Sequence, residues 1–115
     1  MDKTSVFLVD DHRMLRVGVR VFLDAYDDLL LVGEAESGEA AIWQCLSLRP
    51  DVVLMDLVLP GMDGFEVCRR LKANPVSQPI PVIFITAFPE RLLTGERPEP
   101  AFLITKPYNE AQVRT

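Results

Sequence analysis

The chain has 115 residues and a formal net charge of −5, from 17 acidic and 12 basic side chains. Hydrophobic residues make up 49% and charged residues 25%, which indicates one soluble globular domain rather than a disordered chain. The acidic balance argues against a nucleic-acid-binding surface, and no apolar run reaches the ~20 residues of a membrane helix. The two cysteines, Cys45 and Cys68, form no disulfide framework or zinc motif. With no secretory signal at Met1-Asp2-Lys3, we expect a cytoplasmic domain without direct binding to nucleic acid or membrane.

Five short apolar runs predict the strands. They lie near residues 5–9, 29–32, 52–55, 82–85 and 101–105, and the first four hold four or five consecutive strand formers each. Such continuous runs are typical of a parallel sheet that is covered on both faces.

Amphipathic segments between the first four runs predict three helices. The first, residues 13–25, has apolar or small residues on one predicted helical face: Leu15, Gly18, Val19 and Phe22. The second begins after Ser37, a favourable N-cap, and ends at Pro50. The third begins at Asp63-Gly64 and ends at Asn74-Pro75. The predicted inner faces of these two helices are Ala41, Ile42 and Cys45, and Val67, Cys68 and Leu71.

The alternation is irregular between Pro89 and Pro100. These twelve residues also hold Gly95 and Pro98, and proline inside a helix costs ~3 kcal/mol. We therefore expect no regular fourth helix here, and at most one or two helical turns around residues 91–94.

The conspicuous polar residues follow the predicted strands: Asp10 and Asp11, Asp56, Thr86 and Lys106. The carboxyl ends of parallel strands share one edge of a sheet, where ligands bind. Carboxylates that meet there repel one another unless a cation lies between them, and an all-oxygen set without a histidine cluster or thiolates favours Mg²⁺ over Ca²⁺. A lysine and a hydroxyl group opposite them suit a phosphoryl group.

Each of these residues taken alone has an ordinary structural explanation. An aspartate after a strand is usually a helix cap, and Lys-Pro is usually a turn. His12 is assigned to the start of a helix, because no second histidine or cysteine is placed to share a metal with it. Trp43 is assigned to packing or surface. Only the joint placement of the polar set at one sheet edge argues for a site.

Together these features resemble the receiver domain of bacterial two-component response regulators. The matching segments are Val9-Asp10-Asp11, Asp51 to Asp56, Pro60 to Gly64, Ile85-Thr86-Ala87 and Lys106-Pro107. The resemblance implies a flavodoxin-like, doubly wound, five-stranded parallel sheet with strand order 2-1-3-4-5. It spans nearly the whole chain, which is expected to be a receiver domain over residues 1–115, truncated in its fifth helix as in a fragment of a longer regulator.

The resemblance also implies roles for the polar residues. Asp56 is the expected phosphoacceptor, and Asp10, Asp11, Asp56 and the backbone carbonyl of Val58 are expected to hold Mg²⁺. Thr86 and Lys106 are expected to contact the phosphoryl oxygens. The expected partner is a sensor histidine kinase or a phosphotransfer protein, with a homodimer possible and a transcriptional output through a domain absent here. The domain is then no classical enzyme, since it catalyses only its own phosphorylation and slow dephosphorylation.

Two alternatives to a phosphorylated signalling module are open at this point. An aspartate-nucleophile phosphatase would need a second acid two residues after Asp56, where this sequence has Val58. A phosphate-independent interaction domain is disfavoured by the complete set of Asp10, Asp11, Asp56, Thr86 and Lys106. Two departures from the family pattern leave it open, which are Leu103 in place of the usual aromatic residue and the Pro-rich 89–100 stretch.

Overall fold

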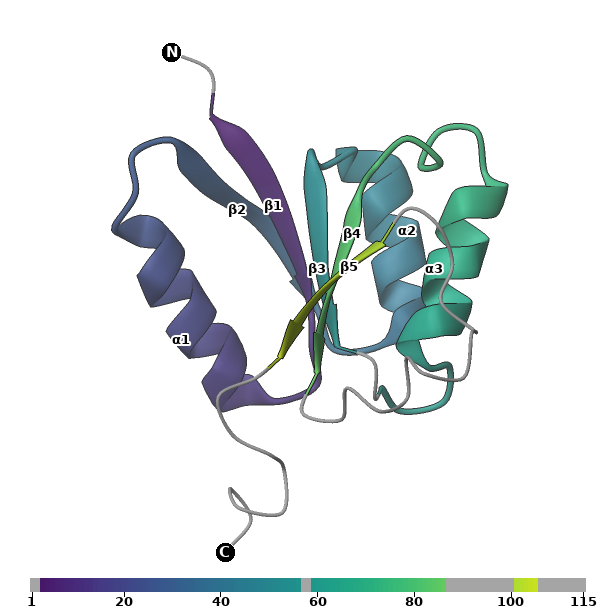
Figure 1. Cartoon of the computed structure of the whole chain (residues 1–115), viewed down its shortest axis with the longest axis horizontal. Helices are drawn as coiled ribbons and strands as arrows, with labels where there is room; N and C mark the ends of the chain where they lie inside the picture. The colour runs from purple at the N-terminus through teal and green to yellow at the C-terminus, as the bar shows by residue number, and fades with distance from the viewer. Residues whose placement is uncertain (1–2, 57–58, 87–100, 106–115) are drawn as a thin grey trace, which may run out of the picture.

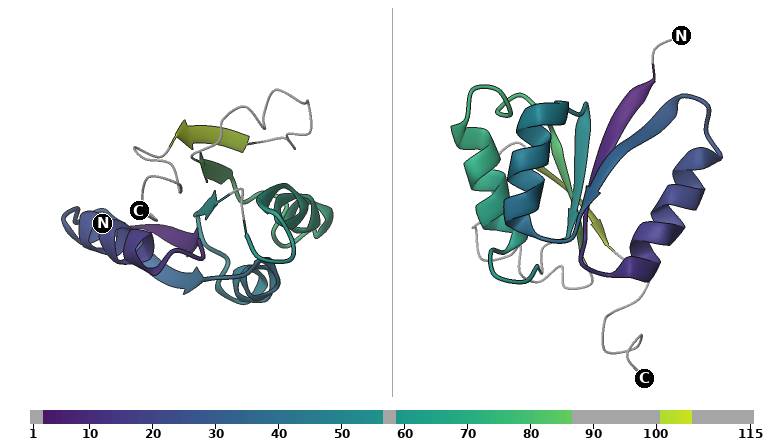
Figure 2. Two further views of the ribbon diagram at one scale, coloured as in Figure 1. Left: turned by 90° about the horizontal axis from the view of Figure 1, so that it is seen from below. Right: turned by 180° about the vertical axis from the view of Figure 1, so that it is seen from behind.

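The computed structural model describes residues 3–56, 59–86 and 101–105. Their central parallel sheet has α1 on one face and α2 and α3 on the other (Figure 1, Figure 2). The elements in chain order are β1 Thr4–Val9, α1 Arg13–Asp24, β2 Leu29–Ala35, α2 Gly38–Leu48, β3 Val52–Asp56, α3 Gly64–Ala73, β4 Val82–Thr86 and β5 Ala101–Thr105.

The sheet has the strand order β2-β1-β3-β4-β5, and all its neighbouring strands are parallel. This confirms the predicted doubly wound fold, including its strand order. The registers place Val9 beside Met55, and Asp56 beside Ile85. The carboxyl ends of β1, β3 and β4 therefore lie at one edge of the sheet, at the point where the chain order reverses on either side of β1.

The predicted cap of the second helix and the predicted start of the third helix are confirmed. The Ser37 side chain accepts a hydrogen bond from the backbone N–H of Ala40, and the Asp63 side chain accepts one from the N–H of Glu66. Each satisfies one of the N–H groups that a helix start leaves without an intrahelical partner. Both helices therefore begin where the sequence predicted.

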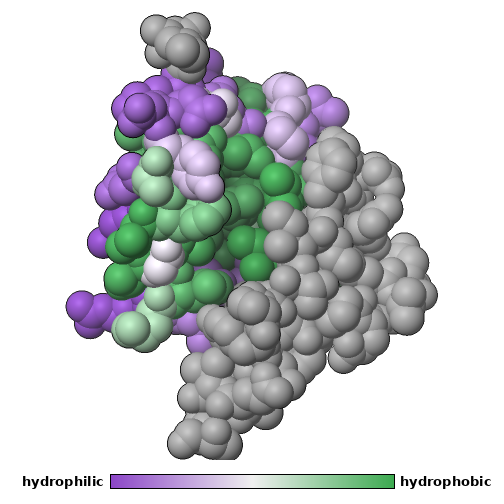
Figure 3. Space-filling model, turned by 60° about the vertical axis from the view of Figure 1, so that its left-hand side comes forward, coloured by the Kyte–Doolittle hydropathy of each residue, from purple (hydrophilic) through white to green (hydrophobic). Residues whose placement is uncertain are grey.

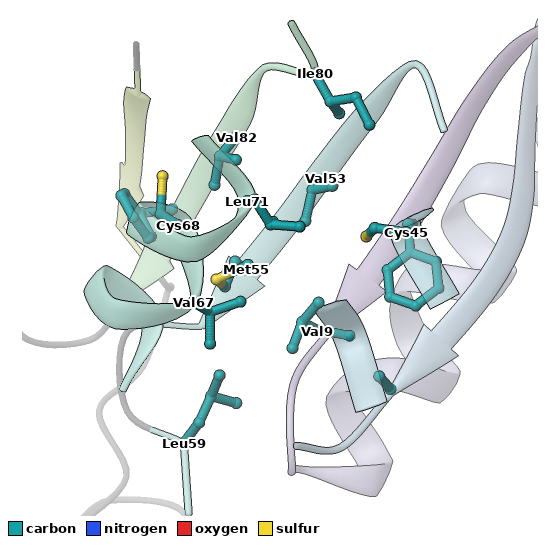
Figure 4. Close-up of a cluster of buried hydrophobic side chains, with 14 of the residues drawn as sticks. Val9, Cys45, Val53, Met55, Leu59, Val67, Cys68, Leu71, Ile80 and Val82 are labelled. Carbon is teal, nitrogen blue, oxygen red and sulfur yellow. The ribbon is translucent and has the colours of Figure 1, made fainter. Parts of the chain in front are cut away.

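The main core lies between the sheet and the helices α2 and α3 (Figure 4). Alternate side chains of β1, β3 and β4 enter it, and α2 and α3 contribute the inner faces predicted from their periodicity. Cys45 and Cys68 are both fully buried there, as predicted for small core residues, and burial raises the pKa of the Cys45 thiol to about 12. Complete burial of a side chain such as Phe7 or Met55 contributes about 1.5–3 kcal/mol to stability.

The predicted inner face of α1 is wrong at two positions. Phe22 is 60% exposed and packs against the ring of Tyr26, Gly18 lies in open space, and Leu23 is the residue that α1 buries. The inward stripe is thus Leu15, Val19 and Leu23, at spacings of four residues. Figure 3 brings the side of the molecule that carries α1 forward and shows hydrophobic surface on that side.

Several predictions concern residues outside the described ranges. They are the irregular segment Pro89–Pro100, the truncated fifth helix, and the positions of Val58 and Lys106. Within the described ranges, no helix has the length and apolar character needed to cross a bilayer.

Candidate functional site

The site is built at the carboxyl ends of the two central strands β1 and β3. Asp10 directly follows β1 and Asp56 is the last residue of β3, so the two residues extend the register of neighbouring strands. Their side chains are almost completely buried, with 1% and 2% exposure, whereas Asp11 is exposed on the loop that leads to α1. The structure therefore brings together the three carboxylates that the sequence placed at this edge.

The same cluster includes His12, for which the sequence pattern predicted only a place at the start of a helix. His12 does occupy the N-cap position of α1, with extended backbone, but its side chain makes no capping hydrogen bond. Its Nδ1 atom lies 3.0 Å from Oδ1 of Asp10, 3.2 Å from Oδ1 of Asp11 and 3.7 Å from Oδ2 of Asp56. One potential ligand atom from each of the four residues lies within 4.8 Å of the others.

The turn after β1 is fixed by hydrogen bonds on both sides. The backbone N–H of His12 donates to Oδ1 of Asp10 over 2.7 Å, and Nη1 of Arg16 donates to the Asp10 carbonyl over 3.1 Å. Arg16 also donates to Glu36 beyond the end of β2, over 3.3 Å. The turn that carries two of the carboxylates is thereby tied to α1 and to the edge of the sheet.

A polar cavity lies next to this turn, lined by Arg16, Arg20, Glu34, Ala35 and Glu36. Arg20 pairs with Glu34, and Arg16 approaches the same carboxylate to 3.9 Å. These charges pair with one another across α1 and β2, so an ion-pair network lines the cavity.

Thr86 is the last residue of β4, next to β3 in the sheet, and its backbone pairs with that of Thr105. It is therefore at the same edge of the sheet as Asp56. The two other predicted site residues, Val58 and Lys106, lie outside the described residues.

The described cluster suits a hard divalent cation. Three carboxylates provide the oxygen ligands that Mg²⁺ prefers, and two of them are buried, where their mutual repulsion is least screened by water. A cation between them would relieve that repulsion.

Comparison with known proteins gives one consistent match. The family model described as the response regulator receiver domain matches residues 6–115. The transcriptional regulatory protein LiaR of Bacillus subtilis is 42% identical over 83 residues, which are 72% of this chain and 38% of LiaR. The nitrate/nitrite response regulator protein NarL of Escherichia coli is 38% identical over 94 residues, 82% of this chain and 44% of NarL. The aligned parts thus span about two fifths of these relatives.

Solved structures agree with the sequence match. The signal receiver domain of the putative response regulator NarL from Mycobacterium tuberculosis is similar with a TM-score of 0.81 and 30% identity, over 98% of this chain and 91% of that one. The receiver domain of the sensor histidine kinase PA1611 from Pseudomonas aeruginosa has the same fold, with a TM-score of 0.80 and 22% identity over 97% of this chain and 92% of that one. That structure is described as having a magnesium ion coordinated in its active-site cleft.

Proposed function

This chain belongs to the family of response regulator receiver domains, and on that premise we propose that it accepts a phosphoryl group on Asp56 in a Mg²⁺-dependent reaction. Receiver domains are signalling modules rather than classical enzymes. The single observation that carries the proposal is the cluster of Asp10, Asp11 and Asp56 at the carboxyl ends of two central strands, in which Asp10 and Asp56 are buried. Three carboxylates held this close are costly for a protein and are characteristic of a site that takes a cation.

Asp56 is the acceptor in this proposal because of its place in the sheet. It ends the central strand β3, with the carboxylate after β1 on one side and Thr86 at the end of β4 on the other. Fixed strand ends hold the carboxylate in one position, and phosphoryl transfer depends mainly on position and charge.

The proposed reaction transfers the phosphoryl group from a phosphohistidine of a sensor kinase or phosphotransfer protein. An Asp56 carboxylate oxygen attacks the phosphorus, the O–P bond forms and the P–N bond breaks. The electron pair of that bond stays on the donor imidazole, which takes up a proton from solvent. Asp10, Asp11, Asp56 and the Val58 carbonyl would hold Mg²⁺, which when bound supplies positive charge against the phosphoryl oxygens. Thr86 and Lys106 would donate hydrogen bonds to the same oxygens.

The output of the signal is the second part of the proposal. LiaR is named a transcriptional regulatory protein and NarL a response regulator, and this chain spans less than half of each. We infer a corresponding output, in which phosphorylation of Asp56 switches an output surface of the domain and thereby regulates transcription through a further domain.

Intact-mass measurement tests the proposed acceptor. Incubation with acetyl phosphate and Mg²⁺ is expected to add about 80 Da to the protein. The gain is expected to disappear when EDTA replaces Mg²⁺, and in Asp56→Asn, which keeps the size of the side chain but removes the nucleophilic carboxylate. No gain in the folded wild type with Mg²⁺ would contradict the proposal and favour the phosphate-independent interaction module.

A further inference from the structure

The His12 side chain adds a nitrogen atom to a cluster that is otherwise made of oxygen donors. Its Nδ1 atom is within 3.7 Å of a carboxylate oxygen from each of Asp10, Asp11 and Asp56. His12 is 27% exposed, so it lies at the mouth of the cluster, above the two buried carboxylates. The site proposed for Mg²⁺ therefore has an imidazole nitrogen beside its three carboxylates.

The distances from Nδ1 of His12 to the three carboxylate oxygens fit the spacing of neighbouring ligands around one metal ion. Metal–nitrogen and metal–oxygen bonds of ~2.1 Å place neighbouring ligands about 3.0 Å apart in an octahedron and about 3.4 Å apart in a tetrahedron. The three separations from Nδ1 are 3.0, 3.2 and 3.7 Å, a range that includes these values. The backbone holds His12 close to two of these carboxylates, because His12 directly follows Asp10 and Asp11 in the chain. Its backbone N–H also donates a hydrogen bond to the side chain of Asp10.

Imidazole changes which ion such a site prefers. Mg²⁺ favours oxygen ligands and water, whereas imidazole suits borderline ions such as Co²⁺, Ni²⁺ and Zn²⁺. A mixed set of one imidazole and carboxylates is a ligand set that zinc takes in proteins.

We propose that His12 is a metal ligand that makes this site bind borderline divalent transition ions, represented by Zn²⁺, more tightly than Mg²⁺. The inference rests on the proposed function in using the same three carboxylates as ligands. The consequence is regulatory. Zn²⁺ held by His12 and the carboxylates would coordinate Asp56 and compete with the Mg²⁺ that phosphorylation requires, so it would inhibit phosphorylation.

The chain itself offers a direct test, because His12 is its only histidine. In tag-free, ¹⁵N-labelled protein, the two ring nitrogens give signals that need no assignment to a residue. Saturating Zn²⁺ is expected to shift the Nδ1 signal to a metal-coordinated value, while Mg²⁺ leaves Nδ1 uncoordinated. Thiol binding does not compete, since both cysteines are buried in the core and burial raises the pKa of each thiol.

Calorimetric titration of the wild type and of His12→Asn measures the selectivity. Asparagine is a good N-cap, so the start of α1 is retained, which an unfolding curve will verify. Zn²⁺ is expected to bind the wild type at least about tenfold more tightly than Mg²⁺. The ratio of Zn²⁺ to Mg²⁺ affinity is expected to fall at least about tenfold in His12→Asn. Loss of a residue that only hydrogen-bonds to a metal ligand already lowers metal affinity by about that factor, so loss of a direct ligand is expected to cost at least as much.

Two results would overturn the inference: an Nδ1 signal that saturating Zn²⁺ leaves in place, or a selectivity ratio that His12→Asn leaves unchanged. Either would mean that the imidazole only donates a hydrogen bond to the carboxylates. The mass gain of the wild type in acetyl phosphate and Mg²⁺ is a separate readout. A mass gain with an unmoved ring signal refutes the zinc proposal alone, and a shifted ring signal without a mass gain refutes the phosphoacceptor proposal alone.

Discussion

Asp56→Asn is expected to stabilise the metal-free protein, because it removes one of two buried charges from the cluster of carboxylates. The ligand oxygens of Asp10 and Asp56 lie within 4.8 Å of each other, and both side chains are almost fully buried. At that separation, two unit charges repel by roughly 3.5 kcal/mol at an effective dielectric constant of about 20. The nearby His12 and local relaxation are expected to offset about half of this repulsion, so Asp56→Asn is expected to raise the free energy of unfolding by ~1–2 kcal/mol. The unfolding midpoint then rises by roughly 4–8 °C.

Urea and thermal unfolding in EDTA and in Mg²⁺ provide the assay. Mg²⁺ is expected to stabilise the wild type more than Asp56→Asn, so that the difference between the two proteins narrows when the ion is added. Asp63→Asn is the matched control, because it makes the same change at a carboxylate outside the cluster and retains a good helix cap. Its stability is expected to change by less than ~0.5 kcal/mol. The reasoning is refuted if Asp56→Asn is less stable than the wild type in EDTA, or if Mg²⁺ stabilises both proteins equally.

Two further predictions concern the fold that holds the site. A Cβ at Gly38 would lie 2.4 Å from Cγ2 of Val67, so Gly38→Ala is expected to lower the free energy of unfolding by about 1–3 kcal/mol through overpacking between α2 and α3. Gly18 lies in open space on α1, so Gly18→Ala is expected to raise it by ~0.5–1 kcal/mol. Urea unfolding of both variants checks this, and equal effects would contradict it. Hydrogen bonds from the Ser5 backbone N–H and hydroxyl lower the pKa of Asp51, so its charged form stabilises the folded state above the unfolded-state pKa of about 4. This contribution is lost as the pH falls through the lower, folded-state pKa. Asp51→Asn is therefore expected to be less stable than the wild type at pH 7 and as stable as the wild type in strong acid. A loss of stability that persists unchanged in acid would argue for another cause.

The sheet and two of the three helices follow from local sequence signals. Continuous runs such as Val52–Met55 have no polar face and are stable only inside a covered parallel sheet. Ser37 and Asp63 each combine a capping side chain with an apolar helix face behind it, and both helices begin there. The strand order came from the family resemblance, since short apolar runs do not specify which strands are neighbours.

The orientation of α1 and the place of His12 depend on tertiary contacts. Phe22 and Leu23 are adjacent apolar residues on a helix, and periodicity alone does not decide which of them faces the sheet; Leu23 is buried and Phe22 packs on Tyr26. His12 has no ligand spacing to a second histidine or cysteine. One of its three carboxylate neighbours, Asp56, is far from His12 along the chain and approaches it only in the folded sheet. The sequence Asp-Asp-His at the end of a strand was nevertheless a signal that His12 lies near carboxylates.

The central claim is that Asp56 alone, among three clustered carboxylates, forms the acyl phosphate. The most direct test is to phosphorylate the wild type with acetyl phosphate in Mg²⁺, reduce the acyl phosphate with borohydride, and locate the reduced residue by tandem mass spectrometry. The structure and the family membership predict modification at Asp56 only, and none in EDTA. Modification at Asp10 or Asp11, or at Asp56 without Mg²⁺, would contradict the account.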